Sequence, residues 1–252
     1  MGIVTNGVPA EIVLELARMA NATVFVETGT CHGATARWAA EHFTAVYTVE
    51  RSVELYTRHE KWLRELKGVT PLLGDSREKL PAIVAGLGAR TAVHWLDGHW
   101  SGGNTAGEGD ECPLLAELAC LAGRRQDIIL IDDARLFLSS PPRPYQCEQW
   151  PGIADIIDAL GPAETRPCIQ IIEDVIFAVP NSASMRSRLQ HFAQDRSDSF
   201  WNSYVSLLRG EALPANDLPT PAHSSAAGES AGLHAGSMLW RVLRQALRRR
   251  TQ

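Results

Sequence analysis

Short apolar runs alternate along the chain with longer segments in which apolar residues recur three or four positions apart. The runs predict buried strands and the longer segments predict helices, an order typical of a parallel sheet covered on both faces. His94 lies inside one of the runs and is expected to be a core histidine. The strands are expected at 24–26, 45–49, 69–73, 92–96 and 128–131, followed by a hairpin of 169–172 and 175–179.

Amphipathic spacing places the covering helices between these strands. Ile12, Leu16 and Met19 share one face of the first helix, which is expected to cover the sheet before the first strand. The proline-rich stretch 137–150 has no period and is expected to be a loop or lid over the site. The helices are expected at 9–20, 34–42, 52–67, 77–87, 111–121, 153–160 and 185–195.

These elements predict an α/β fold with a Rossmann-like, doubly wound sheet. The sheet is expected to have seven mostly parallel strands and an antiparallel C-terminal hairpin, within a domain of residues 1–210. Beyond it, 211–236 is rich in Pro, Ala, Ser and Gly and is expected to be a flexible linker, and 237–252 a basic amphipathic tail helix. That helix is expected to contact a membrane surface or a partner, or to pack on the domain or on a dimer mate.

Composition narrows the function classes and the setting. The 252 residues carry a formal net charge of −5, so no nucleic-acid partner is expected. Five cysteines without a C-x-x-C pair favour a reducing, cytoplasmic setting. The chain shows neither an N-terminal signal pattern nor an apolar run near the ~18 residues of a membrane span.

The stretch from Val24 to Thr35 organises the rest of the chain. An apolar strand ends in Glu27, two glycines follow at positions 29 and 33, and a helical pattern begins at Ala34. Such a strand–turn–helix unit points backbone N–H groups at a ligand, which the glycines allow to approach closely. The turn lacks the G-x-G-x-x-G pattern of dinucleotide sites. It therefore favours a nucleoside that carries an amino acid over one that carries a pyrophosphate.

Two acids after the next strands fit the same ligand. Glu50 ends the second strand 23 residues after Glu27, the place where such folds grip ribose hydroxyls; alternatively it caps the next helix. Asp75 follows the third strand. It is expected either to accept a hydrogen bond from an adenine amino group or to be the N-cap of helix 77–87, and one residue can do both.

A second polar group follows the fourth and fifth strands. Asp97 and His99 end one, and the pair Asp132 and Asp133 ends the other. Adjacent carboxylates after buried strands are unfavourable unless a charge or water compensates them. The pair alternatively forms ion pairs with Arg135, and Asp97 alternatively only caps the loop that follows it.

The ordered set of motifs resembles class I S-adenosylmethionine-dependent methyltransferases over about residues 9–180. The first motif departs from the common E/D-x-G-x-G-x-G by lacking the middle glycine. The resemblance implies S-adenosylmethionine as cofactor, with Glu50 on the ribose and Asp75 on the adenine side. The implied cofactor-binding residues are Glu27, Thr28, Gly29, Thr30, His32, Gly33, Glu50, Arg51, Asp75, Ser76 and Asp97.

A narrower resemblance is to the macrocin O-methyltransferase-like enzymes, which act on small-molecule or sugar hydroxyls. It implies that Asp97, Asp132 and Asp133 bind a divalent metal, with Mg²⁺ favoured by the carboxylate oxygens. His99 stands where that family has an aspartate base. It is expected to be a catalytic base beside Asp97, a fourth ligand that would favour Mn²⁺ or Fe²⁺, or a substrate contact. The rival hypotheses are a non-catalytic cofactor-binding scaffold and an NAD-dependent enzyme.

Overall fold

A computed structural model describes residues 7–103 and 105–209. Contacts divide the chain into two units, Met1–Asn202 and Ser203–Gln252, and the description below concerns the first. Its centre is a seven-stranded sheet in the order β3-β2-β1-β4-β5-β7-β6. The first five strands pair in parallel, and β7 pairs antiparallel with both β5 and β6. The predicted sheet with its C-terminal hairpin is confirmed.

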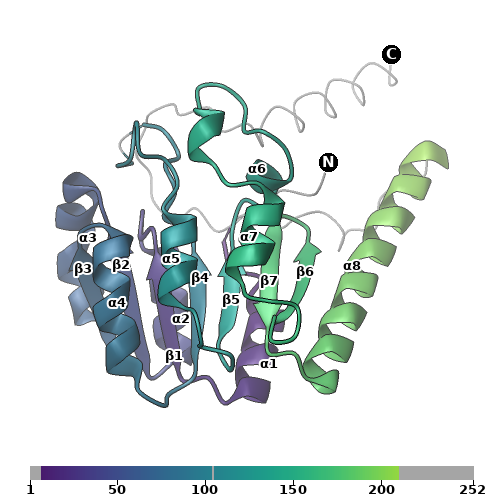
Figure 1. Ribbon diagram of the computed structural model, residues 1–252, viewed down its shortest axis with the longest axis horizontal. Helices are drawn as coiled ribbons and strands as arrows, with labels where there is room; N and C mark the ends of the chain where they lie inside the picture. The colour runs from purple at the N-terminus through teal and green to yellow at the C-terminus, as the bar shows by residue number, and fades with distance from the viewer. Residues whose placement is uncertain (1–6, 104, 210–252) are drawn as a thin grey trace. The chain divides into compact units, whose positions relative to one another are not determined.

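Strands and helices alternate along the chain up to β5 (Figure 1). The strands are β1 (Val24–Thr28), β2 (Ala45–Glu50), β3 (Val69–Leu73), β4 (Ala92–Leu96), β5 (Ile128–Ile131), β6 (Cys168–Ile172) and β7 (Val175–Val179). The helices are α1 (Ala10–Ala20), α2 (Ala34–His42), α3 (Val53–Glu65), α4 (Ser76–Leu87), α5 (Leu114–Cys120), α6 (Arg135–Leu138), the 3₁₀ turn η1 (Cys147–Gln149), α7 (Ile153–Ala159) and α8 (Ala183–Arg209).

Helices cover both faces of the sheet. On one face, apolar residues of α1, α2, α3 and the start of α8 pack on Phe25 and its neighbours. On the other face, α4 packs on β1 and β2, whereas α5, α6 and α7 pack on β4, β5 and β7. Every residue of β1, β4, β5 and β7 is buried. Strands covered on both faces are expected to read as continuous apolar runs, which is why the pattern predicted them.

The local capping signals act as the sequence suggests. Ser52 begins α3, and its hydroxyl accepts a hydrogen bond from the Leu55 N–H. Asp75 is the N-cap of α4, where its carboxylate accepts the Arg77 N–H at 2.9 Å. His94 has no exposed surface and pairs with Asp127 at 2.8 Å, so the prediction of a core histidine is confirmed.

The structure differs from the predicted elements at three places. The helix expected at 111–121 begins only at Leu114, because Pro113 precedes it and Glu111 makes contacts elsewhere. The stretch 137–150 holds the end of α6 and the turn η1. The helix expected at 185–195 runs from Ala183 to Arg209. The predicted linker and tail lie outside the described residues.

The order of the strands reverses beside β1. The chain moves outward from β1 through β2 to β3 and then returns to place β4 on the other side of β1. In open α/β sheets ligands bind beyond the carboxyl ends of the strands at such a reversal. The loops after β1 and β4 meet there. Among the described residues, no helix is long and apolar enough to cross a membrane.

Candidate active site

The loop after β1 lies directly on the backbone of the loop after β4. Gly29 has φ +83°, and a Cβ placed on it would lie 2.1 Å from the carbonyl oxygen of Asp97. The Asp97 N–H in turn donates to the carbonyl of Thr28 at 3.2 Å. Only glycine fits this conformation and this approach. The two loops therefore form one continuous floor at the reversal point.

Glu50 holds the glycine loop from the end of β2. Its Oε2 accepts the Cys31 N–H at 2.8 Å, and its Oε1 accepts the Ser52 N–H at 2.8 Å. Burial raises the pKa of this carboxyl, and the two N–H donors oppose that rise. Each carboxylate oxygen retains a second lone pair, so the group can also accept hydrogen bonds from a diol. The position thus fits the ribose role and also anchors the loop.

Three predicted cofactor residues, Glu27, Thr30 and Gly33, are buried at or within the glycine loop. The Thr48 hydroxyl donates to Glu27 at 2.5 Å and is paired with the Thr30 hydroxyl at 2.5 Å. Glu27 is 1% exposed, and burial raises the pKa of its carboxyl to about 8. Gly33, with φ +72°, precedes α2, and its N–H donates to the Thr30 carbonyl at 2.7 Å. Glu27, Thr30 and Gly33 therefore shape the loop from inside.

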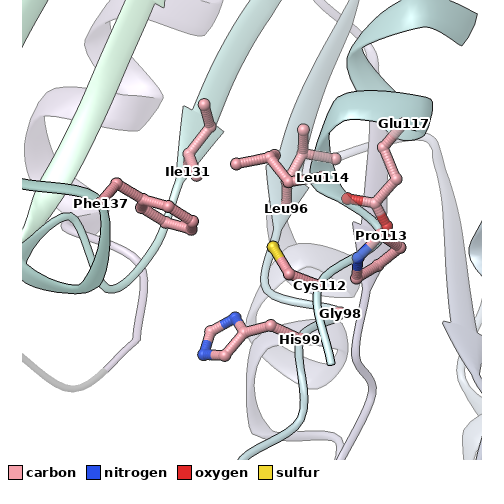
Figure 2. A pocket seen from close by; sticks show the side chains of 9 residues that line it. All are labelled: Leu96, Gly98, His99, Cys112, Pro113, Leu114, Glu117, Ile131 and Phe137. Atoms are coloured by element: carbon pink, nitrogen blue, oxygen red, sulfur yellow. The ribbon is translucent and has the colours of Figure 1, made fainter. Parts of the chain in front are cut away.

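Sequence reasoning missed a buried acid beside this floor. Glu117 of α5 is 1% exposed and interacts with the hydroxyls of Thr28 and Ser76. Its Oε1 has no partner among the described residues and would lie 3.1 Å from a Cβ on Gly98. Figure 2 shows the carboxyl at the edge of a cavity of about 10 Å³ that His99 also lines. That volume is close to the space one water molecule requires.

Asp75 and Arg51, which the sequence predicted near the cofactor, belong to a network of ion pairs. Arg77 Nη2 contacts Asp75 at 2.6 Å and also binds Asp110. Arg51 Nη2 contacts Asp110 at 2.9 Å and its Nε lies 3.5 Å from Asp75. These contacts, of which the hydrogen bond from Arg77 is the strongest, lower the pKa of Asp75. Arg51 is therefore placed to tie the loop around Asp110 to the ends of β2 and β3.

His32, the remaining residue of the predicted cofactor set, is exposed at the glycine loop. Its ring meets His59 of α3 edge-on, with the ring centroids 5.6 Å apart. His59 Nδ1 accepts the Trp62 indole N–H at 3.2 Å, so His59 is held in place by its own helix. His32 thus faces α3 rather than the acidic residues after β4 and β5.

The acids after β4 and β5 surround one histidine. His99 Nε2 lies 2.8 Å from Asp133 Oδ2, and His99 Nδ1 lies 3.5 Å from Asp97 Oδ1. Arg135 Nη1 contacts the other oxygen of Asp133 at 2.6 Å. The side chain of His99 is only 5% exposed, whereas that of Asp97 is 33% exposed. The expected pairing with Arg135 is thus confirmed for Asp133, and Asp97 is the group open to solvent.

Burial and charge separate the pKa values of this cluster. Although a third of the Asp97 side chain is exposed, the surrounding protein desolvates its carboxyl and, with the charge of Asp133, raises its pKa to about 7, while the charge of His99 opposes this rise. Burial and the charges of Asp97 and Asp133 raise the pKa of Asp132 to about 8. The pKa of Asp133 is instead lowered to about 2, because the bonds from His99 and Arg135 outweigh its burial.

His99 responds in the opposite sense. Burial alone would lower its pKa, but the hydrogen bond to Asp133 and the charges of Asp97 and Asp133 raise it to about 9. An imidazole with a carboxylate at each nitrogen is most favourable as the imidazolium, which donates at both positions. The contacts of His99 with Asp97 and Asp133 therefore favour its imidazolium form.

A second layer of contacts fixes Asp133. Asp133 has φ +56°, an unusual conformation for this residue type, and its N–H donates to Asp132 Oδ1 at 2.8 Å. Arg135 also binds Asp174, a buried acid in the turn between β6 and β7 that accepts the Arg135 N–H at 3.0 Å. Asp174 and Arg135 were not recognised as a pair from the sequence, because they lie in different elements.

The expected metal site does not form in this arrangement. The described residues contain no group of three or more His, Cys, Asp or Glu side chains placed to hold a metal ion. His99 and Arg135 each place a nitrogen against one oxygen of Asp133, so basic side chains occupy the space in which an ion would contact that carboxylate. Asp97, Asp132 and Asp133 therefore do not fit a divalent metal as they stand.

Aromatic side chains and a buried acid line one side of the cluster around His99. Trp150 lies edge-on to His99, with ring centroids 5.2 Å apart, and also meets Tyr145 at 5.3 Å. Glu111, 1% exposed, accepts the Trp150 indole N–H at 2.6 Å and the Gln146 N–H at 3.0 Å. Glu111 therefore fastens the stretch 139–152 over the site. The sequence had assigned Glu111 only to a helix.

A groove of about 490 Å³ has Trp150 among its lining residues. Cys112 and Pro113 line both this groove and the small cavity beside His99. Its volume is in the range of small-molecule sites. The groove is lined by Arg77, Cys112, Pro113, Leu115, Ala116, Glu148, Gln149, Trp150, Pro151 and Asp155.

No family model and no curated protein sequence matches the chain. Solved structures do resemble it. The O-methyltransferase TomG from Streptomyces achromogenes, involved in tomaymycin synthesis and in complex with SAM, is 16% identical with a TM-score of 0.48, over 71% of this chain and 82% of that one. A proposed caffeoyl-CoA O-methyltransferase from Staphylococcus aureus is 12% identical with a TM-score of 0.46, over 71% and 86%.

A third similar structure is magnesium protoporphyrin IX methyltransferase from Synechocystis PCC 6803 with bound SAM. It is 17% identical with a TM-score of 0.41, over 68% of this chain and 77% of that one. We infer the function of this chain from the site itself.

Proposed function

We propose that the chain is an S-adenosylmethionine-dependent methyltransferase that methylates a hydroxyl of a small molecule or sugar. The observation that carries this proposal is the contact of Gly29 with the Asp97 carbonyl at the reversal point. It joins a nucleoside-type floor, held by Glu50, to a cluster with a partly exposed carboxylate and a buried histidine. A site that binds a donor and removes a proton from an acceptor needs both halves side by side.

The residues of the glycine loop fit an adenosyl group attached to an amino acid. Glu50 would accept the ribose hydroxyls, and the backbone of Gly29 allows a close approach that a side chain would block. Ser76 and Glu117 lie at the adenine side, where the unpartnered Glu117 Oε1 is a ready acceptor for an amino group. When bound, the donor supplies a sulfonium methyl group, which passes to the acceptor oxygen as the sulfonium becomes a thioether.

The acceptor hydroxyl loses its proton as the new O–C bond forms. Asp97 receives this proton, because its carboxylate is one-third exposed whereas His99 is enclosed between Asp97 and Asp133. His99 keeps Asp97 in place and stabilises its charge. This assigns to Asp97 the base role that the sequence had favoured for His99. The acceptor would enter by the groove that Trp150 lines, because this groove shares Cys112 and Pro113 with the small cavity beside His99.

Calorimetry and methyl transfer together test the proposal. The purified chain is titrated with S-adenosylmethionine, S-adenosylhomocysteine and NAD, and acceptors with free hydroxyls are screened using a labelled methyl donor. We expect both sulfur nucleosides to bind, NAD not to bind, and label to reach at least one acceptor. Binding of NAD alone would favour a dehydrogenase, and cofactor binding without transfer to any acceptor would favour a non-catalytic scaffold.

A further inference from the structure

The positive charge among the acids after β4 and β5 comes from the chain itself. His99 presents a nitrogen to each of Asp97 and Asp133, at 3.5 and 2.8 Å. Arg135 takes the other oxygen of Asp133 at 2.6 Å. Two basic side chains thus stand among three acids. Like charges this close require a nearby cation, and in this site side chains provide it.

We infer that His99 and Arg135 take the place of a divalent cation, so that Asp97, Asp132 and Asp133 bind no such ion while His99 is present. This departs from what the resemblance implies for these three acids. The inference concerns cation binding, so it can be tested whether or not the chain transfers methyl groups.

The contacts of His99 turn both of its ring nitrogens toward acids and not toward an open space that a metal could occupy. A ligating imidazole must turn a bare nitrogen to the ion, yet both nitrogens of His99 face carboxylate oxygens. The ring has no room to swing away. It is buried, and Trp150 lies edge-on against it with centroids 5.2 Å apart. His99 therefore remains between the acids that an ion would have to join.

Arg135 is equally constrained. Its backbone N–H and its guanidinium both bind Asp174, which is 2% exposed in the β6–β7 turn. The same guanidinium binds Asp133 Oδ1. Asp133 is itself held at φ +56° by the bond of its N–H to Asp132. An ion that recruited Asp133 would have to break contacts with two elements.

The sequence offers a direct way to reverse this arrangement. His99→Asp removes the cation between Asp97 and Asp133 and adds a carboxylate at the same point. The variant gathers four acids at the ends of two neighbouring strands, the oxygen-rich set that Mg²⁺ and Mn²⁺ prefer. We expect His99→Asp to acquire a site for Mn²⁺ that the natural chain lacks.

Binding of Mn²⁺ is measured on the full chain by the loss of the free-ion electron paramagnetic resonance signal, with Mg²⁺ as competitor. At equal concentrations of protein and Mn²⁺, we expect the natural chain to leave the free-ion signal unchanged. We expect His99→Asp to bind Mn²⁺ at least about tenfold more tightly than the natural chain does. His191→Asp, which makes the same change on the exposed surface of α8, is the matched control and should behave as the natural chain.

The substitution Asp132→Asn tests whether a bound ion uses the carboxylate of Asp132. Placed in His99→Asp, it should abolish the new site, and circular dichroism shows whether each variant is folded. Tight Mn²⁺ binding by the natural chain that disappears in Asp132→Asn would overturn the inference, and this result does not depend on the folding of His99→Asp. A folded His99→Asp that gains no Mn²⁺ would also overturn it, since His99 would then not be what excludes the ion.

Discussion

Glu27 shows how one buried carboxyl makes stability depend on pH. It lies under the glycine loop, where burial raises its pKa from 4.5 to about 8. Between these values the unfolded chain has lost the proton that the folded chain retains. Stability therefore falls as pH rises from about 4.5 to about 8 and then levels off with respect to this group.

Glu27→Gln should remove that contribution. The amide has no proton to lose, and its oxygen can still accept the Thr48 hydroxyl that now donates to Glu27. We expect a smaller fall in Tm between pH 5 and pH 8 than in the natural chain, with little difference at pH 5. Thermal melts at several pH values measure this. Parallel pH dependence in the two proteins would show that Glu27 is ionised in the fold.

Glu50 is the residue on which cofactor affinity should depend most. Glu50→Ala should weaken S-adenosylhomocysteine binding by about 1.5–3 kcal/mol, or roughly 10- to 150-fold, because hydrogen bonds to a charged group are lost. Calorimetry measures the change. Glu54→Ala, which removes an exposed carboxylate paired with Arg58 on α3, is the control and should leave affinity unchanged. Equal affinities in folded Glu50→Ala and natural chain would exclude Glu50 from the site.

At this scale the sequence identified the reactive residues better than their partners. Asp97, His99 and Asp133 were predicted as one cluster, because the carboxyl ends of neighbouring parallel strands meet at one edge of a sheet. The contacts that decide their roles join residues 34 and 39 positions apart, such as His99 with Asp133 and Arg135 with Asp174. Pairs this far apart produce no local sequence pattern. For this reason a metal ion was expected at the place that His99 and Arg135 occupy.

Among the elements, the stretch 139–152 depends on one acid from another loop. Glu111 accepts hydrogen bonds from Trp150 and Gln146, and its own N–H donates to Gln149 at 2.8 Å. The stretch supplies Trp150 to the wall beside His99 and to the groove. Its order should therefore control access of the acceptor but not of the methyl donor.

Glu111→Ala should release this stretch. Loss of the carboxylate leaves the Trp150 indole and the Gln146 N–H without their acceptor, at a cost of about 1.5–3 kcal/mol. We expect faster chymotrypsin cleavage at Tyr145 and a lower kcat/KM for the acceptor, with unchanged S-adenosylhomocysteine affinity. The control is Glu108→Ala, an exposed acid of the same loop. Unaltered proteolysis in Glu111→Ala would mean that other contacts hold the stretch.

Element boundaries were predictable where periodicity and caps agree. Strands β1, β4, β5 and β7 match the apolar runs because each is short and buried along its whole length. Strands β2, β3 and β6 are only partly buried, and their apolar and β-branched residues still predicted them. The start of α5 was not predicted, since Glu111 fits the helical spacing but its side chain is used by Trp150. The far end of α8 was missed because its later residues include large apolar side chains that remain partly exposed, Phe200 and Trp201 among them.

For the whole molecule, the buried core of the first unit ends well before residue 210. Among the residues whose burial is described, its apolar members run from Ile12 to Leu189, and α8 contributes Met185 and Leu189 to them. A chain that stops after Gly210 should therefore stay folded, with nearly the same Tm and S-adenosylhomocysteine affinity. A chain that stops after Pro180 is the contrasting case.

The shorter chain loses Met185 and Leu189, whose burial contributes about 1.5–3 kcal/mol each. We expect its Tm to fall clearly below that of the chain ending at 210. Thermal melting curves of the full chain, the chain ending at 210 and the chain ending at 180 measure these differences. If the chain ending at 210 melts as early as the one ending at 180, the remaining residues contribute to the stability of the domain.

The close approach of Gly29 to the Asp97 carbonyl has a thermodynamic consequence. The donor loop and the loop that carries the proposed base share one contact, so neither can shift without the other. A ligand that orders one of the two loops also restrains the other, so the second ligand loses less conformational entropy when it binds. By linkage the effect is reciprocal: the factor by which the methyl donor tightens acceptor binding equals the factor by which the acceptor tightens donor binding. The contact at Gly29 therefore couples the binding free energies of the methyl donor and the acceptor.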